Sequence, residues 1–173
     1  MNENFKLLIG YDGSSSADAA LDDLKKAGLP ARVEALIFSV AEVWLPPKEA
    51  AGEEQEFLTE GLRRKYAEHL KILADIEQAA NRAAERLKSM FPAWNVRAEA
   101  TYGSPAWEIL AKADEFKPDL IVVGARGQTA LDRILIGSIS QKVVTEARAS
   151  VRVARGKIEV NGSPERIVIG YDG

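Results

Sequence analysis

A glycine- and serine-containing loop in the second half of the chain has the composition of an anion-binding site. It runs from Gly124 to Ser140 as GARGQTALDRILIGSIS, directly after a strongly apolar stretch. Glycines let main-chain amides approach an anion closely, and successive amides in glycine turns can form a phosphate nest. The amides of Ser138, Ile139 and Ser140 would open a helix whose dipole favours negative charge. Both serine hydroxyls add donors, and Arg126 adds a positive charge.

The glycines of this loop also fit a simpler interpretation. They could serve as turn formers, with Ser138 as an ordinary N-cap of the next helix. The loop lacks the lysine and the hydroxyl residue of the G-x-x-x-x-G-K-[ST] motif. No serine lies in a G-x-S-x-G nucleophile elbow. Because phosphoryl transfer needs a positioned nucleophile and concentrated positive charge, the sequence indicates a phosphate cradle without an evident catalytic base.

A second turn with a candidate ligand residue follows the first apolar stretch, in KLLIGYDGSSSA. Asp12 lies at the carboxyl end of this predicted strand, and two interpretations are open. It could form a turn beside Gly13 and cap the next backbone groups. It could also contact a ligand held by the glycine loop, and its place opposite that loop at one edge of the predicted sheet favours this second role.

Apolar runs that alternate with segments of helical period must position these loops. Helices are predicted after Ser14, Pro105 and Ser138, where serine or proline suits a first turn. Strands separated by helical crossovers predict an open parallel sheet with helices on both faces. Ligands bind such sheets at the carboxyl ends of the strands. The predicted strands are Lys6–Asp12, Arg32–Val40, Asn95–Gly103 (with the alternation of an edge strand), Asp119–Ala125 and Ser150–Arg155.

One helical segment is longer than the sheet that it would cover. Apolar residues keep a single stripe from Leu58 to Phe91, at steps of three or four. Such a helix would run about 50 Å, whereas a typical strand is about 17–20 Å long. We therefore expect its first half to overhang the sheet or to pack on a partner. The preceding segment, Trp44–Phe57, contains two prolines and breaks the pattern.

Composition excludes several classes of site. The chain has 173 residues, which favours one domain, and its net charge of -3 argues against general affinity for nucleic acid or anionic membrane. The absence of cysteine excludes disulfides, thiolate zinc sites and cysteine nucleophiles. His69, the only histidine, is predicted on a helix surface rather than in a metal site. With no signal-peptide pattern and no apolar run of about 20 residues, we expect a cytoplasmic protein.

The motifs resemble those of the universal stress protein family over about residues 4 to 157. The spacing Gly124-x2-Gly127-x9-Gly137-Ser138 matches the family's ATP-binding loop in full. IGYDGSSSA is similar to its first strand and turn, GSPAWEIL to the turn and helix before its fourth strand, and SVRVAR to its last strand. The resemblance implies an α/β fold with strand order 3-2-1-4-5.

The resemblance also implies a nucleotide site between the first and fourth strands, for ATP or sometimes AMP or ADP. Asp12 would reach the ribose or a phosphate-bound Mg²⁺ ion, and Val40 would contact adenine. The match at Arg126 is looser than the others. The residues implied to line the adenosine side are Gly10, Tyr11 and Asp12, and those implied to hold ribose and phosphates are Gly124, Arg126, Gly127, Gly137, Ser138, Ile139 and Ser140.

The pentapeptide IGYDG occurs twice, at Ile9–Gly13 and at Ile169–Gly173. This repeat predicts a universal stress protein domain over residues 1–157, a linker over 158–165 and the first strand of a second repeat over 166–173. We expect the last segment to add to a sheet edge or a neighbouring subunit. The family resemblance further implies a homodimer through Ser150–Arg155, or a pseudo-dimer with the second repeat.

Three functions stay open from the sequence. The first is an ATP-binding module that regulates a stress response through nucleotide-dependent order in Trp44–Phe57 and Arg126–Ile136. The second is a weak ATPase using the same site, with at most slow hydrolysis. The third is a nucleotide-free interaction or dimerisation domain. The related adenylating enzymes share the architecture, but their glycine-serine turn is not present in YDGSSSA.

Overall fold

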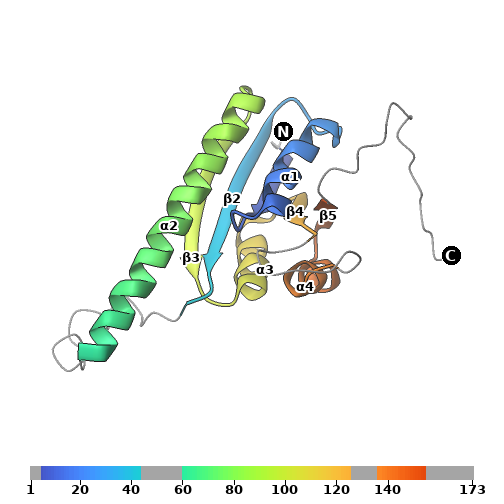
Figure 1. The fold of residues 1–173 in the computed structure, drawn as a ribbon. Helices are drawn as coiled ribbons and strands as arrows, with labels where there is room; N and C mark the ends of the chain where they lie inside the picture. The colour runs from blue at the N-terminus through green and yellow to red at the C-terminus, as the bar shows by residue number, and fades with distance from the viewer. Residues whose placement is uncertain (1–4, 44–59, 126–135, 155–173) are drawn as a thin grey trace.

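A single parallel sheet organises the chain. The computed structural model describes residues 5–43, 60–125 and 136–154 of the sequence. The sheet has the order β3-β2-β1-β4-β5 (Figure 1), which confirms the predicted α/β class and strand order. The strands are β1 (Phe5–Gly10), β2 (Val33–Ala41), β3 (Asn95–Tyr102), β4 (Leu120–Gly124) and β5 (Ser150–Ala154).

Helices cover both faces of the sheet (Figure 1). Leu7 and Ile9 of β1 point into a core with α1 and α2, whereas Leu8 points into a second core with α3 and α4. This alternation follows from the two-residue period of a strand, and burial on both faces explains the continuous apolar runs of the central strands. The helices are α1 (Ser15–Asp23), the 3-10 turn η1 (Leu24–Lys26), α2 (Glu60–Met90), α3 (Pro105–Phe116) and α4 (Ser138–Glu146).

The first strand is shorter than predicted because its last two residues turn away. The sequence predicted a strand as far as Asp12, but β1 ends at Gly10. The Asp12 carboxylate accepts a hydrogen bond from the Ser14 amide at 3.0 Å, and Gly13 has a φ of 75°. Ser14 then caps α1, since its hydroxyl accepts from the Ala17 amide at 3.1 Å. The turn between β1 and α1 is therefore set by local hydrogen bonds and one glycine.

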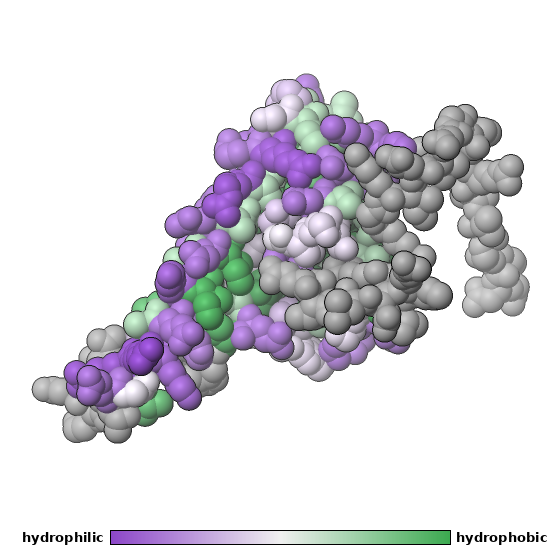
Figure 2. All heavy atoms as spheres, in the orientation of Figure 1, coloured by the Kyte–Doolittle hydropathy of each residue, from purple (hydrophilic) through white to green (hydrophobic). Residues whose placement is uncertain are grey.

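The long helix α2 projects beyond the sheet. Its 31 residues span about 46 Å, and its fully buried residues all lie in the last third, from Ala80 to Leu87. Leu62, Leu70 and Ile72 in its first half are exposed. Figure 1 shows this half extending past the carboxyl ends of β2 and β3, and apolar surface is visible along α2 in Figure 2. The predicted overhang is confirmed.

Several predicted segments lie outside the described residues. They are the Trp44–Phe57 segment, most of the Arg126–Ile136 loop, the linker and the second IGYDG copy. Within the described ranges, no helix is long and apolar enough to cross a membrane.

Candidate functional site

A cleft of about 230 Å³ opens at the carboxyl ends of β1 and β4. These neighbouring strands stand where the order reverses, because β1 continues to β2 on one side and β4 to β5 on the other. Open α/β sheets bind their ligands at such a switch point. The described lining residues are Gly10, Tyr11, Asp12, Ala17, Phe38, Val40, Pro105, Ile109, Val123, Gly124, Gly137, Ser138, Ile139 and Ser140.

Two glycines keep the floor of this cleft close-packed and free of side chains. A Cβ atom on Gly10 would lie 3.1 Å from Ile109 Cδ1 and 3.2 Å from Val123 Cγ1. A Cβ atom on Gly124 would lie 3.0 Å from the carbonyl carbon of Ser16. Both contacts are tight, so these positions favour glycine for packing as well as for ligand approach.

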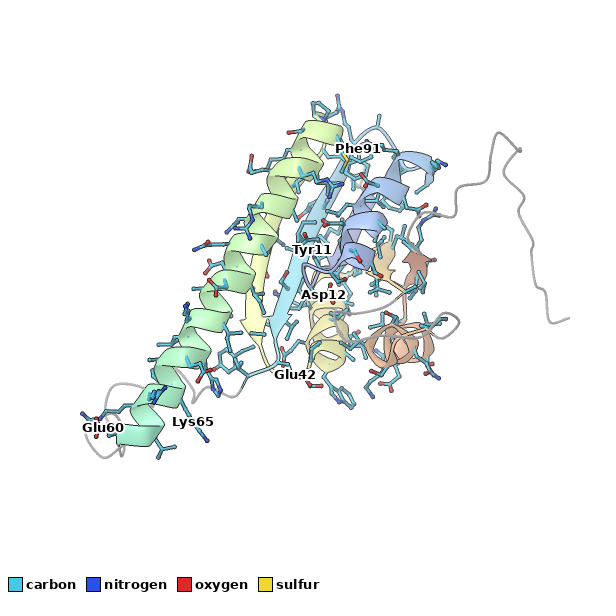
Figure 3. The ribbon with its side chains drawn as sticks, viewed as in Figure 1. Tyr11, Asp12, Glu42, Glu60, Lys65 and Phe91 are labelled. Carbon is cyan, nitrogen blue, oxygen red and sulfur yellow. The ribbon has the colours of Figure 1, made fainter. Side chains whose placement is uncertain are left out.

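The β1 side of the cleft is held by hydrogen bonds to β2 and α1. The Tyr11 amide donates to the Phe38 carbonyl at 3.0 Å, and the Ser39 hydroxyl donates to the Tyr11 carbonyl at 2.6 Å. The Tyr11 hydroxyl donates to Asp18 Oδ1 at 3.0 Å. Tyr11 and Asp12 directly follow β1, at the start of α1 (Figure 3). Hydrogen bonds from Tyr11 to β2 and α1 therefore fix the position of the turn that carries Asp12.

The opposite side of the cleft is the first turn of α4. The Gly137 amide donates to the Ala125 carbonyl at 2.8 Å, and Gly137 rather than Ser138 is the N-cap. Amides at the start of a helix have no intrahelical acceptor, so those of Ser138 and the following residues can serve an anion. The buried Ser140 hydroxyl donates to the Gly124 carbonyl at 2.6 Å. The Ser140 hydroxyl, which the sequence predicted as a donor to the anion, therefore already donates within the protein.

The electrostatics of the described lining are simple. Asp12 is its one carboxylate, and no lysine, arginine or histidine is among those described residues. Burial, reinforced by the hydrogen bond to Asp18 and by the negative charge of that carboxylate, raises the pKa of Tyr11 to about 12. In the described ranges, no group of three or more acidic or histidine side chains could hold a metal ion alone.

The structure brings together nine of the predicted site residues. They are Gly10, Tyr11, Asp12, Val40, Gly124, Gly137, Ser138, Ile139 and Ser140. The other two, Arg126 and Gly127, lie outside the described residues. Sequence reasoning missed Ala17, Phe38, Pro105, Ile109 and Val123 as lining residues. These side chains are apolar or nearly so, and their sequence pattern does not separate the wall of a ligand site from the core.

Comparisons with known proteins agree with this arrangement. A sequence profile of the universal stress protein family matches residues 3–155. The chain belongs to the universal stress protein family. No curated protein matches this universal stress protein significantly in sequence.

Solved structures resemble this universal stress protein over most of their length. Hypothetical protein MJ0577 is 25% identical with a TM-score of 0.62, and the match covers 88% of this chain and 96% of that one. The universal stress protein UspA from Lactobacillus plantarum is 26% identical with a TM-score of 0.57, over 89% and 100%. An Arabidopsis thaliana universal stress protein family protein, solved with AMP bound, is 14% identical with a TM-score of 0.58, over 90% and 94%.

Proposed function

We propose that this universal stress protein binds an adenine nucleotide, with ATP as the expected ligand, and acts as a nucleotide-responsive regulatory or stress-response module. The observation that carries this proposal is the cleft itself: the first turn of α4 faces the Gly10–Asp12 turn across the switch point of the sheet. A universal stress protein family protein of the same fold, solved with AMP bound, supports the ligand class.

The two halves of the cleft suit different parts of a nucleotide. Val40, Ile109 and Val123 offer an apolar wall for a base, and the main-chain groups of Gly10 to Asp12 can contact the sugar. The amides at the start of α4 suit phosphate oxygens. The described volume is somewhat below the roughly 300–1,000 Å³ of drug-sized ligand pockets, so it suits a base and its sugar, with the phosphates at the start of α4. Arg126 and Gly127 are proposed phosphate contacts outside the described residues.

A divalent cation would offset the repulsion between the Asp12 carboxylate and a bound phosphate chain. A phosphate chain near Asp12 would meet a carboxylate, and like charges in one site repel. Mg²⁺ is commonly held by one or two carboxylates together with substrate phosphates. We therefore propose that Asp12 contacts a phosphate-bound Mg²⁺ ion. Chelation of Mg²⁺ should weaken ATP binding more in the wild type than in Asp12→Asn.

Isothermal titration calorimetry with ATP and AMP tests the function directly. Ser138→Glu puts a carboxylate where the phosphate is proposed, while an acidic residue in a first helical turn does not weaken the helix. We expect ATP affinity to fall at least about tenfold, because like-charge juxtaposition costs several kcal/mol. Gln141→Glu, exposed one turn later, is the matched control and should bind normally. Absence of binding to the wild type would sink the proposal and favour a nucleotide-free interaction domain.

Hydrolysis and assembly are separate questions about the same module. Phosphate release above background that is lost in Asp12→Ala would favour the weak ATPase. For assembly, we propose a homodimer through β5, which is an outer strand of the sheet in the described part of the chain, or a pseudo-dimer with a second repeat. An open strand edge offers unpaired main-chain groups to another strand.

We also propose a cytoplasmic location, which imaging of the tagged full chain would test.

A further inference from the structure

Arg86 of α2 bridges two acidic residues of α1, Asp18 and Asp22. Its Nη1 atom lies 3.0 Å from Asp18 Oδ1, and its Nη2 atom lies 2.8 and 2.9 Å from the two carboxylate oxygens of Asp22. The three side chains are partly exposed, so the ion pairs alone contribute little to stability. The planar guanidinium nevertheless fixes direction, because its donors form a rigid fork. The arrangement therefore links α1, which packs on β4 and β5, to α2 through side chains.

Asp18 connects Arg86 to the candidate site. The oxygen that accepts from Arg86, Oδ1, also accepts from the Tyr11 hydroxyl at 3.0 Å. Tyr11 lines the cleft, and its main chain is already bonded to β2 at Phe38 and Ser39. Side chain and main chain of Tyr11 are thus fixed by different elements. Arg86 lies 75 positions from Tyr11 in the sequence. Both side chains nevertheless donate to the same oxygen of Asp18.

The first turn of α1 provides a second route to the site. The Asp18 amide donates to the Ser14 carbonyl at 3.0 Å, and the Ser14 amide donates to the Asp12 carboxylate at 3.0 Å. The same turn contacts Gly124, whose α carbon faces the Ser16 main chain. A shift of the first turn of α1 would therefore disturb Asp12, which follows β1, and Gly124 at the end of β4.

We propose that Arg86 and Asp18 are positioning residues of the nucleotide site: they touch no ligand, and they hold Tyr11 and the first turn of α1 where the cleft needs them. This inference rests on the proposed nucleotide binding. It also connects the cleft to α2, the helix whose other half projects beyond the sheet (Figure 1). A binding site whose side chains are already held in place by other residues binds its ligand more tightly, because less ordering is left for the ligand to impose.

The direct test measures ATP affinity by calorimetry in Arg86→Gln. We expect a loss of about twofold to fivefold, the range that follows when an ion-pair effect of about 0.4–1 kcal/mol is passed on to binding. Arg86→Lys should recover part of this loss, since one ammonium cannot bridge both carboxylates bidentately. Arg82→Gln, an exposed position one turn earlier on α2, is the matched control. Wild-type affinity in Arg86→Gln would overturn the inference.

A double-mutant cycle with Tyr11→Phe separates positioning from general loosening. Tyr11→Phe removes only the hydroxyl that meets Asp18, so its fold should persist even if an Arg86 variant is unstable. If Arg86 acts through Tyr11, Arg86→Gln should cost clearly less affinity in the Tyr11→Phe background than in the wild type. Additive losses would overturn the route through Tyr11.

Amide hydrogen exchange tests the network without any nucleotide. Because Arg86 and Asp18 are proposed to hold Tyr11 and the first turn of α1, Arg86→Gln should speed exchange at the Tyr11 and Ser14 amides, whereas Arg82→Gln should not. Unchanged exchange in Arg86→Gln would overturn the network itself. If instead exchange becomes faster and the wild type binds no ATP, the proposed function fails while the contacts stand.

Discussion

Single glycines in the cleft differ in what an added methyl group would meet. In Gly10→Ala the new atom faces the ends of two side chains, Ile109 and Val123, which can shift by a few tenths of an ångström. In Gly124→Ala it faces the main chain of Ser16, which cannot move without moving α1. We expect Gly124→Ala to lower the free energy of unfolding by about 1–3 kcal/mol and Gly10→Ala by less than about 1 kcal/mol.

Urea denaturation of both variants checks this order. Gly61→Ala is the matched control, because a Cβ atom at this helical position meets nothing within 4 Å. It should leave stability unchanged or raise it by up to about 1 kcal/mol, since alanine is the better helix former. Equal losses at Gly10 and Gly124 would contradict the packing account.

Tyr11 gives a residue-scale prediction for alkaline pH. A folded-state pKa raised to about 12 from 10 means that the folded protein holds the proton more tightly than the unfolded chain. The stabilising contribution is therefore complete below pH 10 and is lost as the pH rises to about 12. Two pKa units correspond to about 2.7 kcal/mol, and solvent screening at this half-buried position reduces the expected contribution to about 1 kcal/mol.

Denaturation at several pH values in wild type and Tyr11→Phe measures this contribution. The difference in unfolding free energy between the two proteins should shrink above pH 10. Other groups titrate in the same range, and the matched variant cancels them. A difference that stays constant from neutral pH to pH 12 would rule out the proposed linkage.

The sequence was informative about single residues where their type alone carries the chemistry. The glycine and serine spacing from Gly124 to Ser140 and the aspartate after β1 identified both sides of the cleft. The same reasoning could not find Asp18 and Arg86, because their contact joins positions 68 apart through side chains of ordinary surface type. Apolar lining residues such as Ile109 carry no signal that separates a ligand wall from the core.

At the scale of elements, the apolar residues of α2 keep one helical period along its whole length, but only its second half is buried against the sheet. The apolar stripe predicted one continuous helix, and periodicity alone could not show where the sheet ends beneath it. Leu87 is fully buried, whereas Leu70 is 43% exposed. Leu87→Ala should lower the free energy of unfolding by about 2–5 kcal/mol through the cavity that it leaves. Leu70→Ala should cost less than about 1 kcal/mol.

The two leucine variants form a matched pair, because the substitution and the helix are the same. Their unfolding free energies can be compared in urea at one protein concentration. A loss at Leu70 as large as that at Leu87 would show that the overhanging half is covered in solution. That result would point to a partner surface on the first half of α2.

At the scale of the whole molecule, the two edges of the sheet should behave differently. Among the residues that the structure describes, β3 and β5 are the outer strands of the sheet. β3 carries the charged side chains Arg97 and Glu99, which pair with each other, and charge discourages pairing with another strand. β5 has half-buried Val151 and Val153, while Arg152 is used internally by Asp23 at 2.7 Å. We therefore expect self-association through β5 and not through β3.

Light scattering and hydrogen exchange together test this assembly. We expect the mass of two 18.9 kDa chains and slower amide exchange in β5 than in β3, because pairing would satisfy the outward main-chain groups of β5 alone. The same measurements without Arg166–Gly173 ask whether the second IGYDG copy takes part. An unchanged mass would remove that segment from the assembly. A single-chain mass with equal exchange at both edges would refute the β5 dimer, leaving nucleotide binding to a monomer.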